Sequence, residues 1–392
     1  MATINFRHFI KPGIMMAIAP DRLVSLLFPH REYFNRRGFF FPGEVSGPIN
    51  YAKLSDILVD PDDQVPSNLV DALYFISEMA SIKISDRLVA VARSVHPDMT
   101  FSPIATAADT VVEVWLKDPD LVAKIHAASL INKPKSFEYY LSRNPQYRSF
   151  SMPTSEAIQA MEAEMDEWFD QNRRGRDCRI IVSDHGDRIS FLIRHGKQMR
   201  RDSRITNGKS VGICYRPEVY DVVFYDRIRD ELGIRASGTK GEKTLYRETI
   251  GDHIFNNWNY FKGDQKFTLE PLAKDGIASL VCSDVDGLDQ VTLKAYGHRL
   301  NDGCSATDWH TSENLFHTMA ELKRTMPPAS HMTKAVFLLK FTNVQKPRSL
   351  TIKLPNSVMY LRDEESHVID KWLSKRGFTA KPLEGESHAI NT

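Results

Sequence analysis

The stretch Thr154–Ile193, TSEAIQAMEAEMDEWFDQNRRGRDCRIIVSDHGDRISFLI, changes its hydrophobic period from that of a helix to that of strands. Over residues 154–172, large apolar side chains recur at helical spacing: Ile158, Met161, Met165, Trp168 and Phe169. After Gly175, two short apolar runs flank Asp184-His185-Gly186-Asp187, which is typical of a hairpin turn. The stretch therefore predicts an amphipathic helix followed by an antiparallel β-hairpin. We expect the apolar stripe of this helix to be buried against a helical domain.

Residues 1–150 carry mostly helical patterns. The segment Asn68–Ile82 repeats apolar residues at helical spacing. Asp118-Pro119-Asp120 is typical of a helix start, with Asp as the cap and Pro at the first helical position. Between Phe39 and Pro66 the chain is rich in Pro and Gly, which predicts a long surface connection. We therefore expect a helical N-terminal domain over residues 1–150.

Further along the chain, short apolar runs follow one another with polar breaks, which favours an antiparallel β-meander. Residues 151–300 predict a helix from about Lys240 to Phe255 and several strands, among them Val211–Tyr215, Tyr220–Tyr225, Leu232–Ala236, Phe267–Leu272, Ala278–Cys282 and Val291–Tyr296. Residues 301–392 predict a smaller mixed α/β region with strands Val336–Phe341 and Leu350–Leu354 and a last helix over Asp363–Arg376. The expected fold class is α+β.

Composition excludes several classes of protein. The 392 residues contain 51 Lys and Arg against 50 Asp and Glu, so the chain is not a globally basic nucleic-acid coat. No apolar run approaches the roughly 18 residues that span a membrane, and we expect no membrane contact. The four cysteines are widely spaced, which predicts free thiols in a reducing compartment. We therefore expect a cytoplasmic protein.

Positive charge is concentrated in one segment, Arg173–Arg216. It holds twelve Lys and Arg and four Asp, a surplus of eight positive charges. Cations on strands and loops can follow phosphates, which predicts contact with nucleic acid or another polyanion. The candidate contact residues are Arg194, Lys197, Arg200, Arg201, Arg204 and Lys209. The alternatives are that the acidic helix at 154–172 neutralises the segment, that it is simply a solvated face, or that it meets a protein partner.

A second candidate is the segment Ser237–Thr244, SGTKGEKT, between an expected strand and an expected helix. Glycines before a helix N-terminus can cradle an anion. The candidate anion-binding residues are Gly238, Thr239, Lys240, Gly241 and Lys243. The spacing does not match a phosphate-binding GxxxxGK[ST] loop, because Glu242 stands between Gly241 and Lys243. We therefore do not expect nucleotide hydrolysis.

A third candidate is a nuclease-like set of residues. Metal-dependent phosphodiester cleavage needs carboxylates that converge on Mg²⁺, usually with a Lys near the attacking water. Asp221, Glu231, Glu242 and Lys243 offer these groups, but the adjacent Glu242 and Lys243 would not share one face of a strand. The stretch from His298 to His331 is rich in metal-ligand types, yet its spacing matches no zinc motif, so we expect no resident metal.

These observations favour a non-enzymatic cytosolic binding or assembly protein that contacts nucleic acid through the basic segment and needs no cofactor. No intact catalytic motif is present in the sequence. The first alternative is a Mg²⁺-dependent nuclease or phosphodiesterase, for example of a prokaryotic defence system. The second alternative is a structural subunit of a protein complex.

Overall fold

The computed structural model describes residues 6, 8–44, 47–131, 135–142, 150–206, 208–236, 238–300, 306–362 and 365–379. The chain divides into two compact units, Met1–Ser129 and Leu130–Thr392. The fold is α+β, with a helical N-terminal unit and a second unit that is built on a large antiparallel sheet. The expected boundaries at 150 and 300 do not coincide with this division. Strand β1 (Ser136–Leu141) already belongs to the sheet, and the sheet continues past residue 300.

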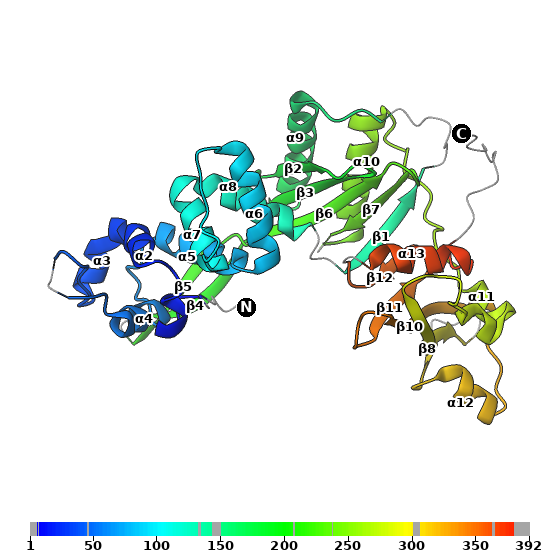
Figure 1. The fold of residues 1–392 in the computed structure, drawn as a ribbon. Coiled ribbons are helices and arrows are strands. Elements are labelled where there is room, and N and C mark those ends of the chain that lie inside the picture. Colours follow the sequence, from blue (N-terminus) through cyan, green and yellow to red (C-terminus); the bar gives the residue numbers. More distant parts are fainter. Residues whose placement is uncertain are drawn as a thin grey trace. The chain divides into compact units, whose positions relative to one another are not determined.

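The N-terminal unit consists of short helices around one apolar core (Figure 1). In chain order they are α1 (Pro12–Met15), α2 (Pro20–Leu27), a 3₁₀ helix (Phe28–His30), α3 (Arg31–Arg36), α4 (Tyr51–Val59), α5 (Ser67–Met79), α6 (Ile82–Val95), α7 (Ala107–Lys117) and α8 (Pro119–Leu130). The expected helix at 68–82 is α5. The expected start at Asp118 is confirmed, because its carboxylate accepts the backbone N–H of Leu121 at 2.9 Å at the start of α8.

The segment between Phe39 and Pro66 is not only a connection, as we expected, because it contains α4. Asn50 caps this helix by accepting the backbone N–H of Lys53 at 3.0 Å. Leu54, Ile57 and Leu58 are buried in the core of the N-terminal unit. The Pro and Gly residues on both sides favoured the prediction of a loop, and the short amphipathic pattern of α4 was therefore missed.

The second unit contains a ten-stranded sheet in the order β2-β3-β6-β7-β1-β12-β11-β10-β8-β9, in which every neighbouring pair is antiparallel. Its strands besides β1 are β2 (Arg179–Asp184), β3 (Arg188–Gly196), β6 (Glu218–Asp226), β7 (Glu231–Arg235), β8 (Leu288–Arg299), β9 (Thr307–Thr311), β10 (Met332–Phe341), β11 (Arg348–Lys353) and β12 (Ser357–Met359). The expected hairpin at 184–187 joins β2 to β3. Strand β1 lies between β7 and β12 and so connects the central strands to the C-terminal ones.

Two helices, α9 (Ser155–Gln171) and α10 (Lys240–Phe255), lie side by side on one face of this sheet (Figure 1). The expected amphipathic helix is α9, which Thr154 caps by accepting the backbone N–H of Ala157. Met161, Met165 and Phe169 of α9 are buried against the central strands and α10. Our expectation that this stripe packs on the helical domain was therefore wrong, because the sheet supplies the nearer apolar surface.

Two segments that we expected to be strands overlap helices instead. The region 267–272 includes the start of α11 (Glu270–Lys274), and the region 278–282 overlaps a 3₁₀ helix (Gly276–Leu280). Pro271 has no N–H to donate to a sheet and suits the first turn of a helix. The remaining elements are α12 (Leu315–Glu321), a 3₁₀ helix (Ala329–His331) and α13 (Ser366–Lys375). The cap expected for the last helix, Asp363, lies outside the described residues.

Candidate functional site

A two-stranded ribbon extends from the paired strands β3 and β6. Its strands, β4 (Arg200–Thr206) and β5 (Lys209–Tyr215), form a sheet of their own. Gly196 pairs with Glu218 at the end of β3 and β6, the backbone N–H of Lys197 then bonds to the carbonyl of Pro217 at 2.8 Å, and Arg200 pairs with Tyr215. Residues 197–216, here called the basic ribbon, therefore continue the β3–β6 pair beyond the large sheet.

The register of the ribbon separates its side chains into two faces. Arg200, Arg204 and Lys209 share one face, because side chains that lie two residues apart on a strand, or opposite each other on paired strands, point the same way. Asp202 lies on the same face, together with Val211, Ile213 and Tyr215, which are each about 40% exposed. Arg201 lies on the other face, where its guanidinium covers Gly212. The ribbon thus combines cations with exposed apolar and aromatic surface.

The other expected contact residues lie at the root of the ribbon. Arg194, on β3, faces Glu218 with 3.6 Å between the ionic atoms. Arg216 donates to the carbonyl oxygens of Lys197 at 3.0 Å and Arg173 at 2.7 Å, which fixes the point where the ribbon leaves the sheet. All of the described residues of β5 are exposed.

The acidic side chains of α9 have partners near their own helix. Asp170 pairs with Arg176 at 2.9 Å, and Glu164 pairs with His253 of α10 at 2.9 Å. Arg200 of the ribbon pairs with Asp202 of its own strand at 2.9 Å. The alternative that α9 neutralises the basic segment therefore holds for Arg176, and for Arg179, which lies 3.9 Å from Glu162. The described ion pairs of α9 do not include Arg200.

Behind the root of the ribbon lies a buried polar cluster that the sequence patterns missed in part. The Nε2 atom of His195 lies 3.1 Å from the Asp221 carboxylate and 3.2 Å from the Glu242 carboxylate. Its Nδ1 atom faces the carbonyl of Gly196 at 2.9 Å. Both ring nitrogens thus face oxygen atoms. The sequence analysis did not identify His195, because it belongs to an apolar strand pattern without any ligand-like spacing. Its contacts with Asp221 and Glu242 are evident only in the folded chain.

Two further side chains complete this buried cluster. Arg174 donates to Glu242 at 2.6 Å, and the Tyr246 hydroxyl donates to Asp221 at 2.8 Å. Burial and the nearby Asp221 charge raise the pKa of Glu242, while Arg174 acts against this shift. Burial also raises the pKa of Tyr246 well above its ordinary value. The buried carboxylates are thus held by hydrogen bonds and by the Arg174 cation, and such partners are the condition for keeping buried charges in a fold.

The four nuclease-like residues do not come together in one site. Asp221 and Glu242 belong to the buried cluster, whereas Glu231 pairs with Lys266 at 2.5 Å and Lys243 pairs with Glu138 at 2.5 Å. Burial raises the pKa of Glu231 and lowers that of Lys266. Lys243 lies on α10, not on a strand. These contacts are those of structural ion pairs, and Asp221 and Glu242 are almost fully buried.

The expected anion loop precedes α10, whose cap residue is Thr239. A Cβ at Gly238 would lie only 1.2 Å from Oε2 of Glu242, so the carboxylate of Glu242 lies directly against this glycine. Lys240 and Gly241 form the first turn of α10. Because a carboxylate of the chain itself already lies at this helix start, the loop offers less room for an external anion.

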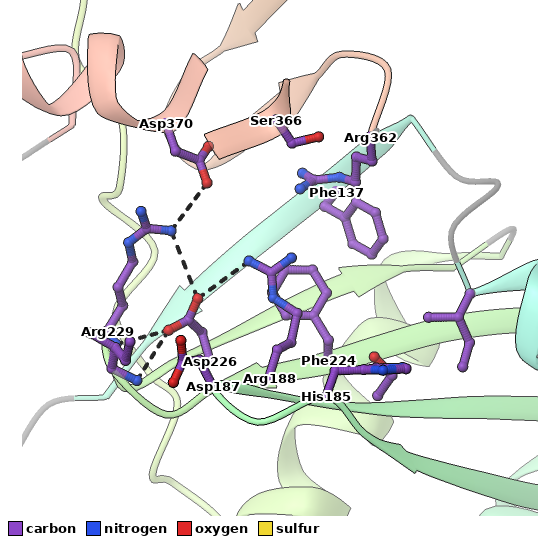
Figure 2. A pocket seen from close by; sticks show the side chains of 13 residues that line it. Phe137, His185, Asp187, Arg188, Phe224, Asp226, Arg229, Arg362, Ser366 and Asp370 are labelled. Atoms are coloured by element: carbon purple, nitrogen blue, oxygen red, sulfur yellow. Dashed lines mark hydrogen bonds and ion pairs between the residues drawn. The ribbon is translucent and has the colours of Figure 1, made fainter. Parts of the chain in front are cut away.

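A pocket of about 480 Å³ lies on the sheet face opposite α9 and α10 (Figure 2). Ser190 of β3 lines it, while the neighbouring Ile189 and Phe191 point into the core beneath the two helices. Figure 2 shows Asp226 between Arg188 and Arg229, and Arg229 reaching Asp370 of α13. Because these lining side chains pair with one another, they neutralise most of the charge of the pocket.

Comparisons with known proteins add no identification: no protein-family model matches the sequence, and a search of curated proteins returned no match.

None of the described helices is long and apolar enough to cross a membrane.

Proposed function

We propose that this protein binds nucleic acid through the basic ribbon, and that its contacts are mainly with phosphates. The observation that carries the proposal is the ribbon itself: a separate, exposed antiparallel pair with Arg200, Arg204 and Lys209 on one face. Phosphate contacts from such cations release counterions and do not depend on a catalytic group. The proposed role is therefore that of a binding or assembly protein.

The dimensions of a two-stranded ribbon support this role. Seven residues in each strand give a length of roughly 23 Å, and a two-stranded ribbon fits the major groove of DNA, which is about 12 Å wide. Tyr215 adds an aromatic ring at the base of the cationic face, beside Arg200. Such a ring can stack on an unpaired base, so single-stranded nucleic acid is also a suitable ligand.

The experiment measures the affinity for labelled duplex and single-stranded oligonucleotides at several salt concentrations. Replacing both Arg200 and Arg204 with Ala removes two cations from the same face. The slope of log affinity against log salt should then become less steep by about one to two, with a similar loss for every sequence. The melting temperature should remain close to that of the wild type, because both side chains are exposed.

The matched control removes two exposed lysines from other strands of the same unit, Lys340 of β10 and Lys353 of β11. This double Ala variant changes the net charge equally but should keep the wild-type slope. Equal losses in both variants would show a nonspecific charge effect. No binding by the wild type at low salt would contradict the proposal and favour a protein partner, for which Ile205, 81% exposed at the ribbon, is a suitable contact.

A further inference from the structure

Three metal-ligand side chains come together at the other end of the sheet, far along the chain from the basic ribbon. His298 lies on β8, and Asp308 and His310 lie on the neighbouring strand β9. The sequence showed these residue types without a zinc-like spacing. Of the other ligand types in the same stretch, His317 pairs with Glu321 on α12, and Cys304 lies outside the described residues.

The register places the three side chains on one face of the sheet. His298 stands directly opposite Asp308, and His310 stands opposite Tyr296, two residues before His298 on β8. One ligand atom from each of the three side chains lies within 4.8 Å of the other two. Ligands around a tetrahedral zinc ion are about 3.3 Å apart, so the three side chains would have to rotate toward one another to hold one ion.

The polar atoms of this group lack other partners. The Nδ1 atom of His298 is buried and has no hydrogen-bond partner. Within the described part of the chain, the Asp308 carboxylate and the His310 ring form no hydrogen bond or ion pair. A buried imidazole nitrogen without a partner can be satisfied by a hydrogen bond or, when it carries no proton, by a metal cation, and the two nearby ligand groups favour the cation.

We propose that His298, Asp308 and His310 bind a divalent transition-metal ion, with zinc as the best match. Zinc is bound in proteins by imidazole nitrogen and carboxylate oxygen, whereas calcium and magnesium prefer oxygen ligands alone. Three protein ligands leave a coordination position for water or another molecule. Asp308 is exposed and the two histidines are partly buried, so solvent reaches the metal at this edge of the sheet.

The buried cluster at His195 has similar residue types but different surroundings. There, Arg174 and Tyr246 already donate to the two carboxylates. A divalent ion would add positive charge beside Arg174 in a closed site. The β8–β9 group has no such competing donor among its described contacts, which is why the proposal concerns that group.

The test uses the full chain, purified without a histidine tag and treated with a chelator. Titration with zinc chloride, followed by calorimetry and metal analysis, should give about one tightly bound zinc ion per chain. The exposed Asp308→Asn substitution and the His310→Ala substitution should each weaken binding by about 100-fold or more. This estimate is a lower bound, because the loss of an outer-shell group alone costs about 10–100-fold.

The matched control is His317→Ala, which removes an exposed histidine from the same region and should leave zinc binding unchanged. Circular dichroism of the metal-free variants shows whether they are folded. If His310→Ala does not fold, the exposed Asp308→Asn substitution still tests the proposal. Absence of zinc binding by the wild type would overturn the proposal. Undiminished binding by Asp308→Asn and His310→Ala would also overturn it, because the metal would then lie elsewhere.

Discussion

Arg200 and Tyr215 stand directly opposite each other across the basic ribbon, and both bind the carboxylate of Asp202. The Arg200 Nε atom lies 2.9 Å from this carboxylate, and the Tyr215 hydroxyl lies 2.7 Å from it. The hydrogen bond from Tyr215 is the main cause that lowers the pKa of Asp202. Asp202 is therefore charged at neutral pH, and it offsets one of the cations on the proposed nucleic-acid face.

Replacing Asp202 with Asn should strengthen nucleic-acid binding. The substitution removes the one acid of the ribbon and frees Arg200 for a phosphate, so the slope of log affinity against log salt should become steeper by about one. Filter binding or fluorescence anisotropy at several salt concentrations measures this slope. An unchanged or weaker affinity would show that Asp202 matters for the shape of the ribbon more than for its charge.

Cys214 provides a reporter on the ribbon itself. It is exposed and stands opposite Arg201, whereas Cys178 is buried beneath α9. Burial raises the pKa of Cys178 to about 12, so its thiol should react slowly with an alkylating reagent at neutral pH. Cys214 lies on the Arg201 face, so nucleic acid bound to the Arg200 face should leave the alkylation rates of both Cys214 and Cys178 close to those of the free protein, as peptide mass spectrometry can measure. Strong protection of Cys214 would instead place the contact on the Arg201 face of the ribbon.

Phe169 should contribute more to stability than Trp168. Phe169 is fully buried in α9, and its ring stacks on His195 with 4.3 Å between centroids, whereas Trp168 is only partly buried. Phe169→Ala should lower the free energy of unfolding by about 3–5 kcal/mol, and Trp168→Ala by about 1–2 kcal/mol. Denaturant unfolding monitored by circular dichroism compares the two variants. The reverse order would contradict the packing of α9 on the sheet.

Gly238→Ala should destabilise the fold although the substitution is small. The added Cβ would overlap the Glu242 carboxylate and push it away from Arg174 and His195, at a cost of about 2–4 kcal/mol. Gly13→Ala is the matched control, because a Cβ at Gly13 of α1 meets open space. Denaturant unfolding of both variants checks the difference. A Gly238→Ala variant as stable as the control would show that Glu242 has room to move.

The sequence allowed the α+β class and most of the elements with strong periodicity to be predicted. Helix α9 and the hairpin from β2 to β3 could be predicted from local spacing, because their buried side chains recur with the period of a helix or a strand. The pairing of β1 between β7 and β12 could not be predicted, since it joins segments that are distant in the sequence. The convergence of His195 with Asp221 and Glu242 depends on the pairing of β3 with β6 and on the position of α10, which the spacing in the sequence does not reveal.

The position of the basic ribbon could be predicted from its charge, but its two-stranded structure could not. The surplus of cations between Arg173 and Arg216 was evident from the sequence, and Val211–Tyr215 was expected to be a strand. Its partner strand, Arg200–Thr206, has too many charged residues to resemble a strand by propensity. The separation of Arg201 from Arg200 and Arg204 follows only from the register of the paired strands.

Removing the ribbon tests the central claim most directly. Replacing residues 199–215 with an Asn-Gly turn shortens the arm at its root but keeps the β3–β6 pair and the contacts of Arg216. Since the ribbon forms a separate sheet, the melting temperature should stay within about 3 °C of the wild type. At a salt concentration where the wild type binds, the shortened protein should show no measurable affinity for nucleic acid. Wild-type affinity in this folded, shortened protein would contradict the claim that the ribbon is the nucleic-acid interface.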